Sequence, residues 1–396
     1  MRVHRPTALL QLETGVGHRM ARLSGLEGFA RSMLVGTVPL VALERLGSKG
    51  AVSQVYTVGA VLALMVTLNL GTLERLIQRR WVATLGLVSL YAAALLFIPS
   101  MRPTFVAAVA LRSAAASIFS VCLTLYIMDY IGKRDLSRNE SRRMVANGMA
   151  WLVGPSLGIF LWQNVDESAP FILSSICALI TLAYFWKLRL EGSVVLRHPT
   201  RTPDNPLRNI KRYFGQRHLR IAYSITLVRA MFWVSVFVYG PIYIVEAGFD
   251  ETVAGLFLSA IAALLFLSPA IRAIAEQVGN RKIIVLGFTI VGSMMITLGA
   301  LGEPRKIGVA FWMLAASGGV CLDVLGNIPF MRTVKPRERT AMATVFSTWR
   351  EMSEFTGPLI GTIVVALSLP FNVYYVILGL LALGTGGVAT FLPRRI

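Results

Sequence analysis

Long apolar runs separated by short polar connections make up almost the whole chain. A helix that spans a bilayer needs about 20 mostly apolar residues, and runs of roughly that length recur from one end of the sequence to the other. We place twelve of them, at 23–44, 52–70, 81–100, 103–131, 143–163, 169–188, 219–245, 252–271, 282–301, 306–331, 343–369 and 372–392. The pattern predicts an all-α membrane protein with twelve transmembrane helices.

Four short sequence elements occur twice, in the same order and about 200 residues apart. They are Arg-x-Met, Glu-x4-Arg followed by Arg or Lys, Val-Cys-Leu and Gly-Pro-x-x-Gly, with copies that begin at Arg31 and Arg229, Glu74 and Glu276, Val121 and Val320, and Gly154 and Gly357. A repeat of this length predicts two pseudo-symmetric six-helix bundles. We place them at 1–190 and 219–396, joined by a basic cytoplasmic linker at 191–218.

Composition and charge support a membrane protein. Only 15% of the residues are charged, against about 25% in soluble proteins, and the mean hydropathy is +0.64. The 39 basic and 20 acidic residues give a net charge of +19. Most basic residues fall on one side of the predicted topology, and the positive-inside rule then places both termini in the cytoplasm. We therefore attribute the charge to attraction to the lipid bilayer, with no nucleic-acid partner.

Three features resemble the major facilitator superfamily, and the resemblance extends over nearly the whole chain. "GTLERLIQRR" (Gly71–Arg80) resembles the family signature between helices 2 and 3, Arg112 resembles an arginine on helix 4, and "AWLVGPSLGI" (Ala150–Ile159) resembles a motif on helix 5. The resemblance implies a secondary transporter with alternating access, rather than an enzyme, and no cofactor. In this family the helix-5 motif is associated with proton-driven exporters.

The same resemblance implies an inner gate. Family members pair an acidic residue near the cytoplasmic end of helix 4 with a base of the helix 2–3 loop, and here these would be Asp129 and Arg75 or Arg79. The full set of gating candidates, with the second-half copy included, is Glu74, Arg75, Arg79, Asp129, Glu276 and Arg281.

Two arginines occupy matching positions in the first helix of each half. At 1.5 Å per residue, Arg31 lies about 13 Å inside its helix, and Arg229 lies at a similar depth. Because forked guanidinium donors match carboxylate and phosphate oxygens, these arginines, with Trp233 and Glu27 beside them, are candidate substrate-binding residues. The organophosphate:phosphate antiporter branch of the superfamily is similar in carrying arginines on helices 1 and 7.

Internal pairing is the alternative for both arginines. Glu27 precedes Arg31 by one helical turn, and Glu351 or Glu354 would pair with Arg229. In that case the arginines neutralise buried carboxylates and do not touch a substrate.

Buried carboxylates are also candidates for proton coupling, because burial favours the protonated form and a neighbouring arginine favours the ionised form. Glu354 and Glu351 are the first candidates, and Arg112 would relay charge as the resemblance implies. A static ion pair is the alternative. For Asp323 two roles stay open: it lines a cavity, or it pairs with Arg112 or Arg350.

Both Gly-Pro-x-x-Gly elements place helix breakers inside predicted spans. A helix in lipid tolerates them where neighbouring helices shield the freed carbonyl and small residues permit close contact. We expect paired sites of packing and bending that serve alternation, at Gly154, Pro155, Gly158, Gly357, Pro358 and Gly361.

The sequence as a whole predicts proton-coupled export of a small organic solute by a monomer in a bacterial inner membrane. The closest alternative is an organic-anion exchanger or importer that uses Arg31 and Arg229. A second alternative is a non-transporting sensor or assembly factor with the same fold. The predicted partners are a small-molecule substrate, with an anion as one option, protons and the bilayer, and no metal site is expected.

Overall fold

The computed structural model describes residues 7–99, 101–130, 136–188, 206–334, 342 and 345–393, and these residues are helical apart from short connections. The chain divides into two compact units. Unit 1 comprises Met1–Val38 and Val58–His198, and unit 2 comprises Pro39–Thr57 and Pro199–Ile396. The division falls inside the first helix, next to its internal Pro39.

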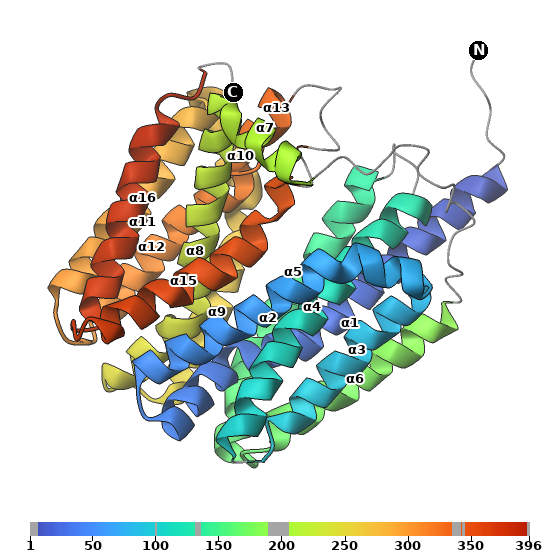
Figure 1. Ribbon diagram of the computed structural model, residues 1–396, viewed down its shortest axis with the longest axis horizontal. Coiled ribbons are helices and arrows are strands. Elements are labelled where there is room, and N and C mark those ends of the chain that lie inside the picture. The colour runs from blue at the N-terminus through green and yellow to red at the C-terminus, as the bar shows by residue number, and fades with distance from the viewer. Residues whose placement is uncertain are drawn as a thin grey trace. The chain divides into compact units, whose positions relative to one another are not determined.

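Unit 1 contains six long helices. These are the first part of α1 (Thr7–Leu46), most of α2 (Lys49–Leu76), α3 (Arg79–Leu96), α4 (Arg102–Tyr130), α5 (Leu136–Asn164) and α6 (Ala169–Lys187). Helix α3 packs against both α4 and α6 (Figure 1). A core of buried side chains, among them Leu23, Leu87, Phe119 and Phe185, joins α1, α3, α4 and α6.

Unit 2 repeats this arrangement with more interruptions. Besides the end of α1 and the start of α2, its helices are α7 (Pro206–Gly215), α8 (Arg217–Glu246), α9 (Glu251–Leu264), η1 (Leu265–Leu267), α10 (Ser268–Val278), α11 (Asn280–Ala300), α12 (Gly308–Leu325), α13 (Ile328–Thr333), α15 (Trp349–Ala366) and α16 (Asn372–Ala389). Helix α11 lies between α12 and α16, and α8 lies against α15 (Figure 1). The short α7 packs on the start of α8, so this part of the linker belongs to the second unit.

Each of the twelve apolar runs coincides with one helix or, at 252–271 and 306–331, with successive helices, which confirms the all-α membrane architecture. Among the described residues, ten helical segments are long and apolar enough to cross a membrane. Helices α3 and α15 coincide with the two other predicted spans, and the count of twelve stays a prediction.

One interruption in unit 2 shapes the region described next. Helix α12 ends at Leu325, and α13 begins after Gly326 and Asn327, with Pro329 in its first turn. Proline has no backbone N–H and clashes with the preceding turn, so it favours a break here. The break leaves Asp323 in the last turn of α12.

Candidate functional site

A buried ion pair joins α8 to α12. Nη1 of Arg229 lies 3.3 Å from Oδ1 of Asp323, and the Arg229 side chain is 7% exposed against 31% for Asp323. The same nitrogen donates a long hydrogen bond of 3.5 Å to the backbone carbonyl of Asp323. Gly326 makes room for the guanidinium, since a Cβ there would lie 3.2 Å from Nη1 of Arg229.

Aromatic side chains surround this pair. The guanidinium carbon of Arg229 lies 5.3 Å from the ring centre of Trp349, at the start of α15. Trp233, one turn after Arg229 on α8, stacks on Phe237 with ring centres 5.8 Å apart. Buried Nε of Arg229 has no hydrogen-bond acceptor among the described residues, while the indole of Trp233 interacts with the Asp323 carboxylate. One guanidinium N–H in a buried aromatic setting is thus available to an acceptor.

The structure gives Arg229 an internal partner, as the pairing alternative has it, but the partner is Asp323 and not Glu351 or Glu354. For Asp323, whose role the sequence leaves open, the partner is Arg229 and not Arg112 or Arg350. Glu351 and Glu354 lie half-buried in the first turns of α15.

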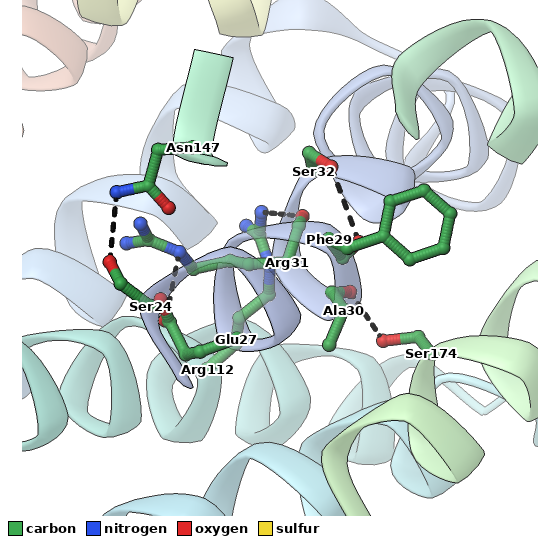
Figure 2. A network of polar contacts seen from close by, with 9 residues as sticks. All are labelled: Ser24, Glu27, Phe29, Ala30, Arg31, Ser32, Arg112, Asn147 and Ser174. Carbon is green, nitrogen blue, oxygen red and sulfur yellow. Dashed lines mark hydrogen bonds and ion pairs between the residues drawn. The ribbon is translucent and has the colours of Figure 1, made fainter. Parts of the chain in front are cut away.

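The matching arginine of unit 1 has a partner on its own helix. Nε of Arg31 lies 3.2 Å from Oε1 of Glu27, one turn earlier on α1, as the sequence predicts. Glu27 is 6% exposed. Arg112 of α4 donates from Nη2 to the backbone carbonyl of Arg31 at 3.4 Å (Figure 2). Arg112 therefore contacts the backbone of α1 at the turn that carries Glu27 and Arg31.

Asn147 of α5 is a polar residue of this region that the sequence pattern does not indicate. Its Nδ2 donates to Oγ of Ser24 at 3.0 Å, while its Oδ1 is buried without a donor among the described residues (Figure 2). Gly28 leaves space for it, because a Cβ at Gly28 would overlap Oδ1 of Asn147. Only the three-dimensional proximity of α5 to α1 identifies Asn147, since one asparagine in a span carries no sequence signal of its own.

The Gly-Pro-x-x-Gly elements are contact sites within each unit. In α5, a Cβ on Gly154 would overlap Oγ of Ser32, and a Cβ on Gly158 would overlap the carbonyl oxygen of Met33. Ser32 reinforces the contact by donating to the carbonyl of Ala150 at 2.8 Å. Helix α5 therefore lies backbone to backbone against α1.

The second copy repeats this contact in part. A Cβ on Gly361 of α15 would lie 2.7 Å from Oγ of Ser53 and 2.9 Å from the hydroxyl of Tyr239. A Cβ on Gly357 would lie at an ordinary 3.4 Å from Val234 and 4.0 Å from the carbonyl oxygen of Met231. Pro155 and Pro358 lie inside their helices, at buried positions. The role of both elements in bending stays a prediction.

The gating candidates are only partly visible. The side chains of Glu74, Arg75 and Asp129 lie outside the described residues. The guanidinium carbon of Arg79 lies 5.7 Å from the ring centre of Tyr126.

In the second half, Glu276 pairs with Arg272 on its own exposed helix face at 3.1 Å. Arg281 donates from Nη1 to the carbonyls of Thr390 and Leu392, at 3.3 and 3.2 Å. Arg281 therefore holds the start of α11 against the end of α16.

Among the described residues no group of three or more His, Cys, Asp or Glu side chains is placed to hold a metal ion. The titratable groups of the candidate site are Arg229 and Asp323 in unit 2, and Glu27, Arg31 and Arg112 in unit 1.

Solved structures give the comparison of fold. A POT family transporter in complex with 5-aminolevulinic acid matches with a TM-score of 0.76 and 13% identity, over 95% of this chain and 96% of that one. A mutant of the nucleoside transporter NupG matches with a TM-score of 0.72 and 15% identity, over 95% and 99%. A D-xylose-proton symporter matches with a TM-score of 0.70 and 15% identity, over 96% and 98%. At these identities the likeness shows the fold.

Sequence comparison gives the family. No curated protein sequence matches the chain. The sequence profile of the Major Facilitator Superfamily matches residues 23–319, which include Arg31 and Arg229 but not Asp323 or Trp349. The chain is an integral, multi-pass membrane protein and a secondary transporter, not an enzyme. It belongs to the major facilitator superfamily.

Proposed function

We propose that the protein moves a small organic anion across the membrane by alternating access, with protons as the coupling ion. The observation that carries the proposal is Arg229, a guanidinium buried among helices whose Nε has no acceptor among the described residues. Ionisable groups inside a membrane are costly and mark substrate or ion pathways. A guanidinium with an unused donor is suited to bind a carboxylate or another oxyanion.

Arg31 is the second proposed contact for the anion, as the repeat places it at the matching position of α1. Both arginines have an internal carboxylate, Glu27 or Asp323. An incoming anion therefore competes with a resident carboxylate for the guanidinium. Such competition supports proton coupling, because protonation of the resident carboxylate removes the competitor.

Glu354 and Glu351, with Arg112 as relay, remain the coupling residues proposed from the sequence. The D-xylose-proton symporter is, by its name, proton-coupled, and it shares the fold. Glu354→Gln tests the assignment directly: if the variant still accumulates solute against its gradient when a pH gradient is imposed, Glu354 is not the coupling residue.

Export in exchange for protons is the second candidate. It is favoured by the helix-5 element, whose resemblance is to proton-driven exporters and whose Gly154 and Gly158 lie against α1. We also propose a bacterial inner membrane, cytoplasmic termini and a monomer, on the charge asymmetry and the short connections of the sequence.

Proteoliposomes test the proposal and separate its alternatives. Labelled organic anions are loaded on one side, and counterflow is measured with and without an imposed pH gradient. Accumulation towards the alkaline side indicates anion–proton symport, whereas exchange against protons indicates export. Arg229→Ala and Arg31→Ala should both lower anion affinity, and unchanged affinity in both excludes the arginines as contacts. If no organic anion crosses by counterflow, the non-transporting alternative is favoured.

A further inference from the structure

Asp323 is the accessible member of the ion pair with Arg229. The arginine is 7% exposed and lies over Trp349, whereas the Asp323 carboxylate is 31% exposed. Asp323 also lies in the last turn of α12, just before the break at Gly326 and Asn327. Asp323 is therefore the more exposed member of the pair and Arg229 the more buried one.

The unused donor of Arg229 indicates which group the site would bind. Nε of Arg229 is a buried N–H group without an acceptor among the described residues, and the Trp233 indole one turn away interacts with the Asp323 carboxylate. A buried N–H group without an acceptor is unfavourable. An oxyanion supplies the acceptor, and the forked guanidinium matches its geometry.

The aromatic side chains near Arg229 indicate what else the solute should contain. Trp349 lies against the guanidinium of Arg229, and the stacked rings of Trp233 and Phe237 are tilted by only 22° to one another. Flat aromatic surfaces favour offset or edge contacts with another ring. The solute that fits both the donors and the rings is a small aromatic oxyanion.

Charge balance then fixes the coupling. The Arg229–Asp323 pair is neutral, so a bound anion alone would leave one net negative charge in a poorly solvated region, and a bound cation would leave one positive charge. Uncompensated buried charge is strongly unfavourable. The region stays neutral only when the anion arrives together with a proton.

We propose that a monovalent aromatic oxyanion binds Arg229 while the Asp323 carboxylate takes up one proton from water and releases the guanidinium. This inference rests on the proposed function and deepens it. It makes Asp323, in place of Glu354 or Glu351, the coupling carboxylate. It also sets the stoichiometry at one proton for each monovalent anion, an electroneutral symport.

The first experiment uses the wild-type, full-length protein and benzenesulfonate, an aromatic anion that stays ionised throughout the accessible pH range. Calorimetric titration in two buffers of different ionisation enthalpy counts the protons taken up on binding. We expect one proton for each anion, and an affinity that falls by about tenfold per pH unit once Asp323 is ionised. Uncharged benzenesulfonamide should bind without proton uptake. Absence of benzenesulfonate binding, or binding with no proton uptake, overturns the inference.

The second experiment uses Asp323→Asn, which mimics the protonated carboxyl, with Glu303→Gln, at an exposed carboxylate between α11 and α12, as the control. Asp323→Asn should bind benzenesulfonate without proton uptake and with no dependence on pH, whereas Glu303→Gln should behave as the wild type does. Proton uptake that is retained in Asp323→Asn and lost in Glu354→Gln contradicts the assignment and returns the coupling role to Glu354. If Asp323→Asn does not fold, the wild-type proton count decides alone.

Transport measurements distinguish a failure of this inference from a failure of the proposed function on which it rests. Benzenesulfonate accumulation driven by a pH gradient in Asp323→Asn proteoliposomes would overturn the role of Asp323 and leave proton-coupled anion transport intact. Wild-type protein that takes up a proton on binding but accumulates no anion would instead refute the proposed function.

Discussion

The hydroxyl groups of Tyr239 and Ser53 lie 2.7 Å apart in a buried hydrogen bond that joins the start of α2 to α8. Gly50, one turn earlier on α2, lies against Val365 of α15. These contacts place Pro39–Thr57 in the second compact unit. They also define a junction whose persistence during transport can be tested by cross-linking.

A disulfide at this junction is expected to stop transport. A Cβ built on Gly50 lies 3.2 Å from Cβ of Val365, so Gly50→Cys with Val365→Cys should cross-link after a small adjustment, since disulfides need about 3.5–4.5 Å. Alternating access moves the predicted bundle 1–190 against 219–396, and the bond would tie them. Flux is measured after oxidation and again after reduction, with the three native cysteines replaced by alanine.

The two single-cysteine variants are the controls and should transport normally. Full flux in the oxidised double variant would mean that Pro39–Thr57 travels with the second bundle. The bundle boundaries predicted from the repeat would then be wrong.

Gly158→Ala should destabilise the protein. The added methyl group would overlap the carbonyl oxygen of Met33 and lie 3.1 Å from Oγ1 of Thr37, and overpacking of this kind costs about 1–3 kcal/mol. Gly148→Ala on the same helix is the matched control, because a Cβ there meets nothing within 4 Å. Thermal unfolding of both variants in detergent checks the difference. Equal midpoints would show that α5 and α1 separate without cost.

Tyr213→Phe should leave stability at neutral pH unchanged or raised. Tyr213 of α7 is fully buried against Tyr223 and Phe330, and its hydroxyl has no partner among the described residues. Removing a buried, unpaired hydroxyl removes its desolvation cost. Tyr213→Ala removes the ring as well and should cost about 3 kcal/mol or more. Unfolding in detergent that ranks the phenylalanine variant with the alanine variant would contradict this.

The same tyrosine gives a pH dependence outside the membrane spans. Burial, and then the nearby Tyr223, raise the pKa of the Tyr213 phenol well above its ordinary value. Since the unfolded phenol ionises near pH 10, the contribution of Tyr213 is fully present below about pH 10 and is lost as the pH rises further. Above about pH 10 the unfolding midpoint of the wild type should therefore fall more steeply than that of Tyr213→Phe, which has no phenol to ionise. A parallel decline of both midpoints would refute the assignment.

Trp349→Leu should weaken the binding of benzenesulfonate. Loss of the ring over Arg229 removes a cation–π contact of about 1 kcal/mol and loosens the guanidinium. Trp349→Phe keeps a ring and should retain more of the affinity, which makes it the matched control. Calorimetry on both variants gives the measurement, and equal affinities would place Trp349 outside the binding region.

The local sequence pattern was enough to predict the helices and one ion pair. Each apolar run became a helix because membrane spanning depends on hydropathy and length, which are properties of a single segment. The pair of Glu27 with Arg31 followed in the same way, since residues four apart share a helix face whatever the rest of the fold does.

Contacts between helices were decided by the tertiary structure. The sequence placed Arg229 and Asp323 in spans but offered Glu351 and Glu354 as partners, because it does not set the rotation of one helix against another. That rotation follows from packing, and it is packing that brings Asp323 beside Arg229, and Trp349 over its guanidinium. The sequence by itself determined which charges enter the membrane, and the fold determined which of them meet.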